Sequence, residues 1–519
     1  MPTTGGISRR GMMLFLAAAM AGCAHRAPDG SSAATVAQGP PAPELPLPVF
    51  LAGNASPDFR AVADVLVEAM RESRIPGAAL GVLTDGREEH ATFGVASASS
   101  LRPVTPDTLF QIGSLSKTYT ATAVWRLIDE RKLAVDGPVR RYLRGLRLSD
   151  RETIEAVTVG NLLDHSAGWY GDEIVDTGDG PYALSRYVDT RLPELPQLFR
   201  CGEFFSYNNA AFQLLGRLVE LTATADYNEA MQRLVLGPLG LANTVLHRAE
   251  VLKRPYADGH TAMEVNGRQT VAVQTPLWMP RNADPAGGIW STTRDVLRYA
   301  RLHLGLLPPG KSRIITAASR TAMQSPAVPV PGLELSMGRS WFVQDVDGLR
   351  VISHDGDTLG QHTVFVAVPQ RRFAFVLLLN GQPGATAGLA ALDEALARYA
   401  GLAPLSGRVG PLRALLAPKD PPEFRPGSAE LRSYAGRYAD PGRVETFRVS
   451  SSGLQRSLEL IQLPGAWQPA LAPPPPDPSP VSFLARDLAV ADGLRLPFVR
   501  NTEGQVGWLA DGLRLRPRG

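Results

Sequence analysis

Ser114 and Lys117 are the two residues whose types and spacing best suit covalent chemistry, because a hydroxyl and an amine stand three positions apart. If Ser114 opens a helix, both side chains lie on one face, one turn apart. That helix is expected because residues 115–136 contain neither Gly nor Pro. A lysine whose pKa is lowered by burial can accept the proton of a serine hydroxyl, and a helix N-terminus favours developing negative charge. The spacing therefore predicts a nucleophile, Ser114, activated by Lys117.

Two further segments are needed, because a Ser-x-x-Lys pair is expected by chance in about one such chain in three. The first is Tyr207-x-Asn209, just before an apolar helical pattern. A phenol near Lys117 would have a depressed pKa and would shuttle a proton to the leaving group. The amide of Asn209 would bind a substrate carbonyl. Taken alone, Tyr207 is better explained as a buried tyrosine in a loop that enters a helix.

The second segment is His354-x-Gly356, ahead of two predicted strands at 363–368 and 373–380. Taken alone, it would be a turn with an exposed histidine. Gly356 would let a substrate lie against the strand edge. The backbone N–H of Asp357 would then form one half of an oxyanion hole, and the N–H of Ser114 the other half.

The order Ser-x-x-Lys, Tyr-x-Asn, His-x-Gly resembles the serine β-lactamase and penicillin-binding-protein superfamily, in the branch of class C enzymes and their esterase and D-peptidase relatives. Four more segments are similar to the family's pattern, and they lie at 75–77, 163–168, 238–240 and 285–291. The resemblance runs from about residue 57 to residue 400. It implies acyl transfer to water through an acyl-enzyme on Ser114, with Lys117 and Tyr207 moving protons. Neither a metal nor an organic cofactor is then required.

The sequence departs from the family at the third segment, where relatives have Lys-Thr-Gly and this chain has His354. A histidine with an ordinary pKa is mostly neutral at pH 7, and Asp355 adds negative charge. Tight binding of a substrate carboxylate is therefore less expected. The sequence favours an esterase or a D-amino-acid amidase or peptidase. A true β-lactamase or D-Ala-D-Ala carboxypeptidase remains an alternative, and a non-catalytic sensor of cell-wall fragments or β-lactams is another.

The first 23 residues have the features of an export signal: Arg9-Arg10, a short apolar run and Cys23 after small residues. Paired arginines indicate the twin-arginine route. Residues 20–23 resemble a lipobox, which implies lipidation of Cys23 and anchoring on the periplasmic side of the outer membrane. Ordinary signal cleavage, with Cys23 incidental, is the alternative. Cys201 is then left without a disulfide partner and is interpreted as a buried small apolar residue.

The remaining sequence predicts a tether at 24–56, a catalytic α+β domain at 57–402, a Pro-rich linker at 403–427 and a small all-β domain at 428–519. The catalytic domain is expected to close an antiparallel sheet with strands from both of its ends. A helix at 59–70 and a hairpin with an Asp85-Gly86 turn belong to its start. Helices and loops are expected over 114–310, and a final helix at 388–399.

The amino-acid composition limits which kinds of binding partner are expected. The net charge of +3 and the absence of a basic run outside the signal give no electrostatic case for nucleic acid. With two cysteines, a thiolate zinc site is excluded. The expected partners are a small ester, amide or peptide substrate and, through the lipid anchor, a membrane.

Overall fold

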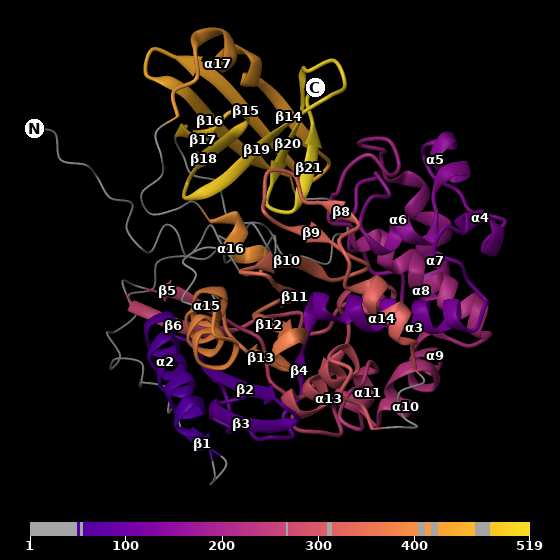
Figure 1. Ribbon diagram of the computed structural model, residues 1–519, viewed down its shortest axis with the longest axis vertical. Helices are drawn as coiled ribbons and strands as arrows, with labels where there is room; N and C mark the ends of the chain where they lie inside the picture. Colours follow the sequence, from indigo (N-terminus) through magenta and orange to yellow (C-terminus); the bar gives the residue numbers. More distant parts are fainter. Residues whose placement is uncertain are drawn as a thin grey trace, which may run out of the picture.

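Both predicted hairpins contribute central strands to a nine-stranded antiparallel sheet in the computed structural model of the chain (Figure 1). At the turn between the first two strands of the catalytic domain, Asp85 and Gly86 have φ values of 47° and 85°, the left-handed geometry expected of an Asp-Gly turn. In spatial order the strands are β1 (Val49–Leu51), β3 (Arg87–Gly94), β2 (Gly77–Thr84), β13 (Phe373–Leu379), β12 (Gln361–Val368), β11 (Leu349–Thr358), β10 (Phe342–Val346), β9 (Ser336–Met337) and β8 (Val328–Pro329).

The structure describes residues 49–51, 55–265, 268–308, 314–382, 384–402, 410–416, 424–461 and 478–519. The predicted export signal and Cys23 lie outside these residues, as does most of the predicted tether. Val49–Leu51, which fall inside that predicted tether, pair with β3 as the edge strand β1.

One face of the sheet is covered by two helices from opposite ends of the catalytic domain, α2 (Pro57–Ser73) and α15 (Gly384–Ala395). Helix α2 begins two residues before the predicted start at Phe59, because the Ser56 side chain accepts a hydrogen bond from the N–H of Phe59 and Pro57 occupies the first turn. The apolar residues of α2, spaced at helical intervals, are buried against the sheet.

The other face is covered by α13 and by the helical region that carries the nucleophile. Helix α3 lies inside this region, and residues 116–125 are all buried. Its buried threonines find partners across the core: the Thr120 hydroxyl donates to the carbonyl of Pro285 at 2.7 Å, and Thr122 lies 2.9 Å from the hydroxyl of Tyr299. Because these buried hydroxyls are hydrogen-bonded, α3 is a rigid support for the residues at its N-terminus. The helices are α3 (Ser116–Asp129), α4 (Val139–Tyr142), α5 (Arg151–Ala156), α6 (Val159–Leu163), α7 (Ala183–Thr190), α8 (Asn209–Ala223), α9 (Tyr227–Met231), α10 (Gly237–Leu239), α11 (Arg248–Val251), α12 (Asp284–Gly287), α13 (Thr293–His303) and α14 (Ala317–Met323).

The structure differs from the sequence-based expectation in two places. The expected helices and loops of 114–310 also contain three short strands. Strands β5 (His260–Val265) and β6 (Arg268–Val273) pair with each other, and β7 (Trp290–Ser291) pairs with β4 (Phe110–Gln111), which lies just before this range. The His354-x-Gly356 segment lies within the long strand β11 and is not a turn. This strand was not recognised in the sequence because a half-buried strand is identified by alternating apolar and polar residues. The polar residues at 353–357, which border the pocket, do not follow that alternation.

The C-terminal domain is an eight-stranded antiparallel sheet that curls into a barrel above the catalytic domain (Figure 1). A bridge between Tyr438 and Arg518 joins its first and last strands. The aromatic side chains of Tyr434, Phe447 and Phe498 fill the interior. The elements are α16 (Pro411–Leu415), α17 (Ser428–Tyr434), β14 (Gly436–Asp440), β15 (Arg443–Ser450), β16 (Gly453–Leu460), β17 (Ser479–Ala485), β18 (Leu488–Ala491), β19 (Leu494–Arg500), β20 (Val506–Asp511) and β21 (Arg514–Pro517).

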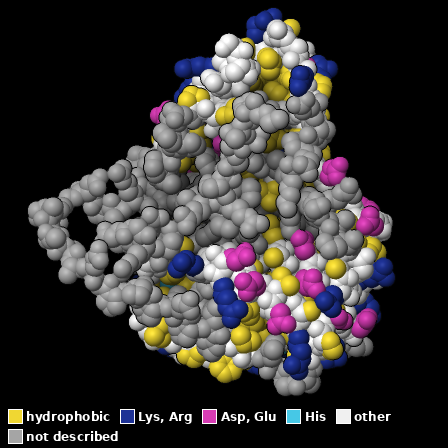
Figure 2. All heavy atoms as spheres, turned by 90° about the vertical axis from the view of Figure 1, so that its left-hand side faces the viewer, with side chains coloured by type: hydrophobic (Ala, Val, Ile, Leu, Met, Phe, Trp, Pro, Cys, Tyr) yellow, Lys and Arg dark blue, Asp and Glu magenta, His cyan; other side chains and the backbone are white. Residues whose placement is uncertain are grey.

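On the face shown in Figure 2, basic and acidic side chains of the described residues are interspersed rather than gathered by sign. Within the part of the chain that the structure describes, no helix has both the length and the apolarity that crossing a membrane requires.

Candidate active site

Ser114 lies in a 3-10 turn, Gly113–Leu115, that leads directly into helix α3. The Nζ atom of Lys117, one turn later, is hydrogen-bonded to the Oγ atom of Ser114 at 3.0 Å. The same Nζ donates to the carbonyl of Ala286 at 2.6 Å. The predicted pairing of nucleophile and base is therefore present in the geometry.

Lys117 is completely buried. Burial and the nearby Arg514 guanidinium lower the pKa of the Lys117 amine well below its ordinary value, and the Asp172 carboxylate opposes this shift. A lowered pKa favours the neutral amine, and only a neutral amine can accept the hydroxyl proton of Ser114. Within hydrogen-bonding distance of Nζ, the described residues place the Ser114 hydroxyl and a carbonyl but no carboxylate.

Tyr207 faces the same reaction centre from the loop before α8, and its ring centroid lies 4.8 Å from Lys117 Nζ. The expected depression of the phenol pKa is wrong for this structure. Burial raises the pKa of Tyr207, and the neighbouring Ser114 hydroxyl only partly offsets that rise. Lys117 cannot lower the phenol pKa strongly, because its own amine is driven toward the neutral form. Tyr207 is therefore suited to donate a proton rather than to act as the first base.

His165 holds the Tyr207 loop in place. Its Nδ1 atom accepts the N–H of Asn208 at 2.9 Å. Its ring is stacked on the ring of Tyr207, with centroids 4.4 Å apart. Burial lowers the pKa of His165 well below its ordinary value. The neutral ring thus serves as an acceptor and a packing surface beneath the phenol.

Strand β11 runs so close to the nucleophile turn that only glycine fits at two positions. A Cβ atom on Gly356 would lie 2.0 Å from the carbonyl oxygen of Ile112 and 3.1 Å from the backbone nitrogen of Ser114. A Cβ atom on Gly113, whose φ is +52°, would lie 2.6 Å from the backbone nitrogen of Asp357. This contact places the backbone of Ser114 beside that of Gly356 and Asp357, and both Ser114 and Asp357 line the pocket. An oxyanion hole requires two neighbouring backbone donors of this kind.

His354 is buried on β11, and burial lowers its pKa to about 3. Its Nδ1 atom lies 2.7 Å from the backbone oxygen of Asp355. The side chain is therefore neutral at physiological pH, as expected from the sequence. The carboxyl group of Asp357 pairs with His362 at 2.7 Å, and this pairing raises the pKa of that histidine although burial alone would lower it.

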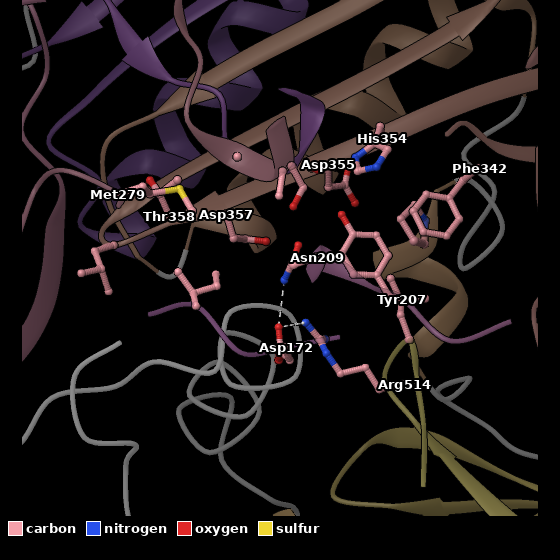
Figure 3. A pocket seen from close by; sticks show the side chains of 17 residues that line it. Asp172, Tyr207, Asn209, Met279, Phe342, His354, Asp355, Asp357, Thr358 and Arg514 are labelled. Atoms are coloured by element: carbon pink, nitrogen blue, oxygen red, sulfur yellow. Dashed lines mark hydrogen bonds and ion pairs between the residues drawn. The ribbon is translucent and has the colours of Figure 1, made fainter. Parts of the chain in front are cut away.

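Asn209 is tied to two residues that the sequence analysis missed. Its Nδ2 atom donates to Asp172 at 2.9 Å, and the Arg514 guanidinium pairs with the same carboxylate oxygen at 2.8 Å (Figure 3). Asp172 reaches this position because the loop before it packs tightly, so that a Cβ atom on Gly171 would overlap Asn208 at 2.4 Å. The amide of Asn209 is thereby fixed toward the pocket.

Arg514 belongs to the C-terminal barrel, at the tip of the β20–β21 hairpin. The carbonyl of Leu513 accepts the N–H of Tyr207 at 2.8 Å, and the Ser206 hydroxyl accepts the N–H of Leu515 at 3.1 Å. The barrel therefore forms one wall of the catalytic pocket. The loop residues of this hairpin are Gly512 and Leu513, since Asp511 pairs with Arg514, and Gly512 has a φ of 64°. Nothing in the sequence indicates where the turn docks.

A buried ion cluster supports this hairpin from inside the barrel. Arg516 pairs with Asp440 at 2.9 Å, Arg443 with Asp511 at 2.7 Å, and Arg456 with Glu445 at 2.6 Å. The carboxyl groups of Asp511 and Glu445 are fully buried. Because each charge depends on its partner in a dry interior, the cluster holds the strands on either side of the turn in one arrangement.

The pocket enclosed by these residues has a volume of about 70 Å³. Figure 3 shows Met279 at one end and Tyr207, Phe342 and Arg514 at the other, with Asn209 and Asp357 between them. The lining residues are Ser114, Asp172, Ile174, Tyr207, Asn209, Met279, Ala286, Gly287, Phe342, His354, Asp355, Asp357, Thr358, Leu359, Pro411, Leu513 and Arg514. Five of the predicted catalytic and substrate-binding residues thus line one small pocket, and they are Ser114, Tyr207, Asn209, His354 and Asp357. Lys117 is hydrogen-bonded to Ser114, and Gly356 packs against the turn that carries Ser114.

Cys201 is a free, half-buried thiol, and burial raises its pKa to about 12. It is therefore protonated at neutral pH and unsuited to act as a second nucleophile. Among the described residues, no group of three or more His, Cys, Asp or Glu side chains is placed to hold a metal ion.

Comparison with known proteins places this geometry in a family. Residues 62–399 match the family model described as Beta-lactamase. The chain belongs to the β-lactamase family. Penicillin-binding protein 4 of Amycolatopsis lactamdurans is 34% identical over 323 residues, which are 60% of this chain and 83% of that protein. A β-lactamase of Providencia stuartii is 28% identical over 253 residues, 48% of this chain, and the match spans only 61% of that relative.

Solved structures agree on the fold. A class C β-lactamase superposes with a TM-score of 0.57 at 22% identity, covering 67% of this chain and 99% of that one. SurE superposes with a TM-score of 0.68 at 25% identity, covering 89% of this chain and 99% of SurE. The match to SurE thus extends beyond the β-lactamase-like domain into the barrel. SurE has also been solved with D-Leu.

We propose that this β-lactamase-family serine hydrolase uses these groups in a sequence of proton transfers. The Lys117 amine would take the Ser114 proton while Oγ attacks the substrate carbonyl, and the N–H groups of Ser114 and Asp357 would bind the oxyanion. The Tyr207 phenol would protonate the leaving group as the bond to that group breaks. Water would then attack the acyl-enzyme, and the same groups would return the protons. Ser114, Tyr207 and Asp357 line the pocket, and Lys117 is hydrogen-bonded to Ser114.

Proposed function

We propose that this enzyme is an esterase or a D-amino-acid amidase or peptidase that acts on substrates without a recognised carboxylate. The observation that carries the proposal is the charge of the pocket. Three carboxyl side chains line it, those of Asp172, Asp355 and Asp357, against a single guanidinium, that of Arg514. The guanidinium is already paired with Asp172.

The neutral side chain of His354 also supports substrates without a recognised carboxylate. A substrate carboxylate beside it would meet an uncharged ring and the adjacent Asp355, with no fixed cation at the strand edge. The pocket carboxylates do not repel a neutral ester, and they attract the amine of a D-amino-acid amide. The solved complex of SurE with D-Leu is compatible with recognition of a D-amino acid.

A β-lactamase or D-Ala-D-Ala carboxypeptidase is the second candidate, favoured by one observation. Arg514 places a cation at the pocket wall, where it would bind a substrate carboxylate if Asp172 released it. The relatives named as a β-lactamase and as a penicillin-binding protein are compatible with this alternative. A sensor that is acylated without turnover is the third candidate, and it requires slow release rather than a missing nucleophile.

A substrate panel on the full chain separates the candidates. The panel contains p-nitrophenyl butyrate, D-alanine p-nitroanilide, a diacetyl-Lys-D-Ala-D-Ala peptide and nitrocefin, and Ser114→Ala is the matched control. We expect kcat/KM for the ester or the D-anilide to exceed that for the two carboxylate-bearing substrates by at least about tenfold, which corresponds to about 1.4 kcal/mol. Fastest turnover of nitrocefin or the peptide contradicts the proposal. Stoichiometric labelling by a fluorescent penicillin without release would establish the sensor.

We also propose that the chain is exported and anchored through a lipidated Cys23. Metabolic labelling with a fatty-acid analogue tests this directly: the wild type should carry the label and fractionate with the outer membrane, whereas Cys23→Ala should not. An unlabelled wild type would support ordinary signal cleavage.

A further inference from the structure

A second cavity lies beside the catalytic pocket and is much larger, with a volume of about 380 Å³. Met279 lines both spaces. The wall between them is the short segment 284–288: Ala286 and Gly287 face the catalytic pocket, whereas Asp284 and Gly288 face the cavity. A catalytic pocket of about 70 Å³ holds little more than the reacting atoms, so most of any larger substrate must lie elsewhere.

The cavity is connected to the nucleophile through its backbone. Gln111, three residues before Ser114, lines the cavity and pairs with Trp290 across the β4–β7 ladder. The next residue, Ile112, donates its N–H to the carbonyl of Ile289 at 2.9 Å. An occupant of the cavity would therefore contact the same two strands that position the Ser114 turn.

Met279 stands where the two spaces meet, at the end of the pocket away from the barrel (Figure 3). A Cβ atom on Gly287 would lie 3.0 Å from its sulfur and 3.1 Å from its terminal methyl. The side chain thus covers a glycine in the wall. Methionine has three rotatable bonds and adapts its shape at low cost, so this side chain can move aside for a substrate.

The lining of the cavity is suited to an aromatic group. The rings of Trp278 and Trp290 lie 5.3 Å apart at 40°, and Leu246 and Leu252 add apolar surface. The Arg248 guanidinium lies 5.1 Å from the centre of the Trp278 ring. Indole surfaces in a concave site bind flat apolar groups through area burial and offset stacking.

Two polar side chains of the cavity lining, those of Gln111 and Asp284, also bear on what it could bind. Gln111 is 2% exposed, and its side-chain oxygen has no hydrogen-bond partner among the described residues. Burial raises the pKa of Asp284 well above its ordinary value, so its carboxyl group is favoured in the protonated form and can donate a hydrogen bond. An unpartnered buried amide costs free energy unless a ligand or water satisfies it.

We propose that this cavity is the subsite for an aromatic acyl group, which packs against the lining that Trp278 and Trp290 form together and reaches Ser114 past Met279. The inference rests on the proposed acyl-enzyme chemistry. It places the acyl portion of the substrate on the side away from the barrel. The leaving group then lies toward Tyr207, which protonates it, and toward Arg514 of the barrel wall.

The test uses esters of one alcohol, 7-hydroxycoumarin, with acetic acid and with 2-naphthylacetic acid. Ala249 lines the cavity and is exposed, so Ala249→Trp fills the cavity without removing a core side chain. Ala156→Trp, an exposed alanine on α5 outside the cavity lining, is the matched control. In the wild type we expect kcat/KM for the naphthylacetyl ester to exceed that for the acetyl ester at least tenfold. Ala249→Trp should remove that advantage and leave acetyl hydrolysis within twofold, and Ala156→Trp should change neither.

A binding measurement keeps this inference separate from the proposed activity. Free 2-naphthylacetate is titrated into Ser114→Ala and into Ser114→Ala with Ala249→Trp, by calorimetry. The proposal predicts at least tenfold weaker binding to the double variant, whether or not either ester is turned over. Equal binding to both proteins overturns the subsite. An equal advantage when the naphthyl group is moved into the leaving alcohol also overturns it. Failure of the wild type to hydrolyse both esters, with binding intact, would refute only the activity.

Discussion

Gly356→Ala is the substitution that most directly tests the close contact between strand β11 and the nucleophile turn. The added Cβ atom would lie 2.0 Å from the carbonyl oxygen of Ile112. Contacts below 3.0 Å are essentially never adopted by real Cβ atoms, so the two backbones must separate by at least 1.0 Å. Both sides of the contact are backbone, and neither can move easily. Strand β11 is a central strand of the sheet, and the N–H of Ile112 is hydrogen-bonded to the carbonyl of Ile289.

That separation acts on the two donors of the oxyanion hole, the N–H groups of Ser114 and Asp357. A hydrogen bond weakens steeply when a 2.9 Å contact is stretched by 1 Å. Loss of one oxyanion donor typically lowers kcat by about 10²- to 10³-fold. We therefore expect Gly356→Ala to lower kcat by at least about 10²-fold, with a smaller effect on KM, because the donors act mainly on the transition state.

The assay is steady-state hydrolysis of p-nitrophenyl butyrate, with thermal unfolding recorded for each variant. Gly145→Ala is the control, since a Cβ atom there meets nothing within 4 Å. It should keep kcat within twofold. A folded Gly356→Ala protein with the kcat of the wild type would refute the assignment of the Asp357 N–H to the oxyanion hole.

Four other predictions follow from the charges of the site. Lys117→Met should abolish acylation, which fluorophosphonate labelling measures. It should also raise the free energy of unfolding at pH 7, measured by urea titration, because burying an amine costs free energy. In the unfolded chain Lys117 has a pKa of about 10.4 and keeps its proton, whereas the folded amine releases it at lower pH. The free energy of unfolding of the wild type should therefore rise with pH until the unfolded lysine also deprotonates. Lys117→Met should lack this rise. On the acid side, kcat/KM should fall as Lys117 becomes protonated. Arg514→Ala should lower kcat/KM for the small ester about tenfold and stability by about 1–3 kcal/mol, because Asp172 loses its ion pair; Arg432→Ala, an exposed arginine of the same domain, should do neither.

The sequence was sufficient for features that depend on local pattern. Helix α2 could be predicted because its apolar spacing and its Ser56 cap are both local. The Asp85-Gly86 hairpin could be predicted because the turn itself demands positive φ values. The Ser114–Lys117 pair lies on consecutive turns, so its spacing in the chain is also its spacing in the structure.

Features that depend on long-range packing could not be predicted. Asp172 and Arg514 are 342 positions apart and meet only because the barrel docks on the Tyr207 loop. The pKa of the Tyr207 phenol was expected to fall, but its direction depends on the degree of burial and on the neutrality of Lys117, and neither can be read from the spacing. The strand character of His354 was hidden because residues that face a site need not alternate between apolar and polar.

The central claim is that Ser114 carries the acyl group. Intact-protein mass spectrometry after reaction with a fluorophosphonate, followed by peptide mapping, tests it most directly. The account predicts a single adduct on the peptide that contains Ser114, and no adduct on folded Ser114→Ala. A wild-type protein that is folded but unlabelled, or one whose adduct maps to another residue, would contradict it.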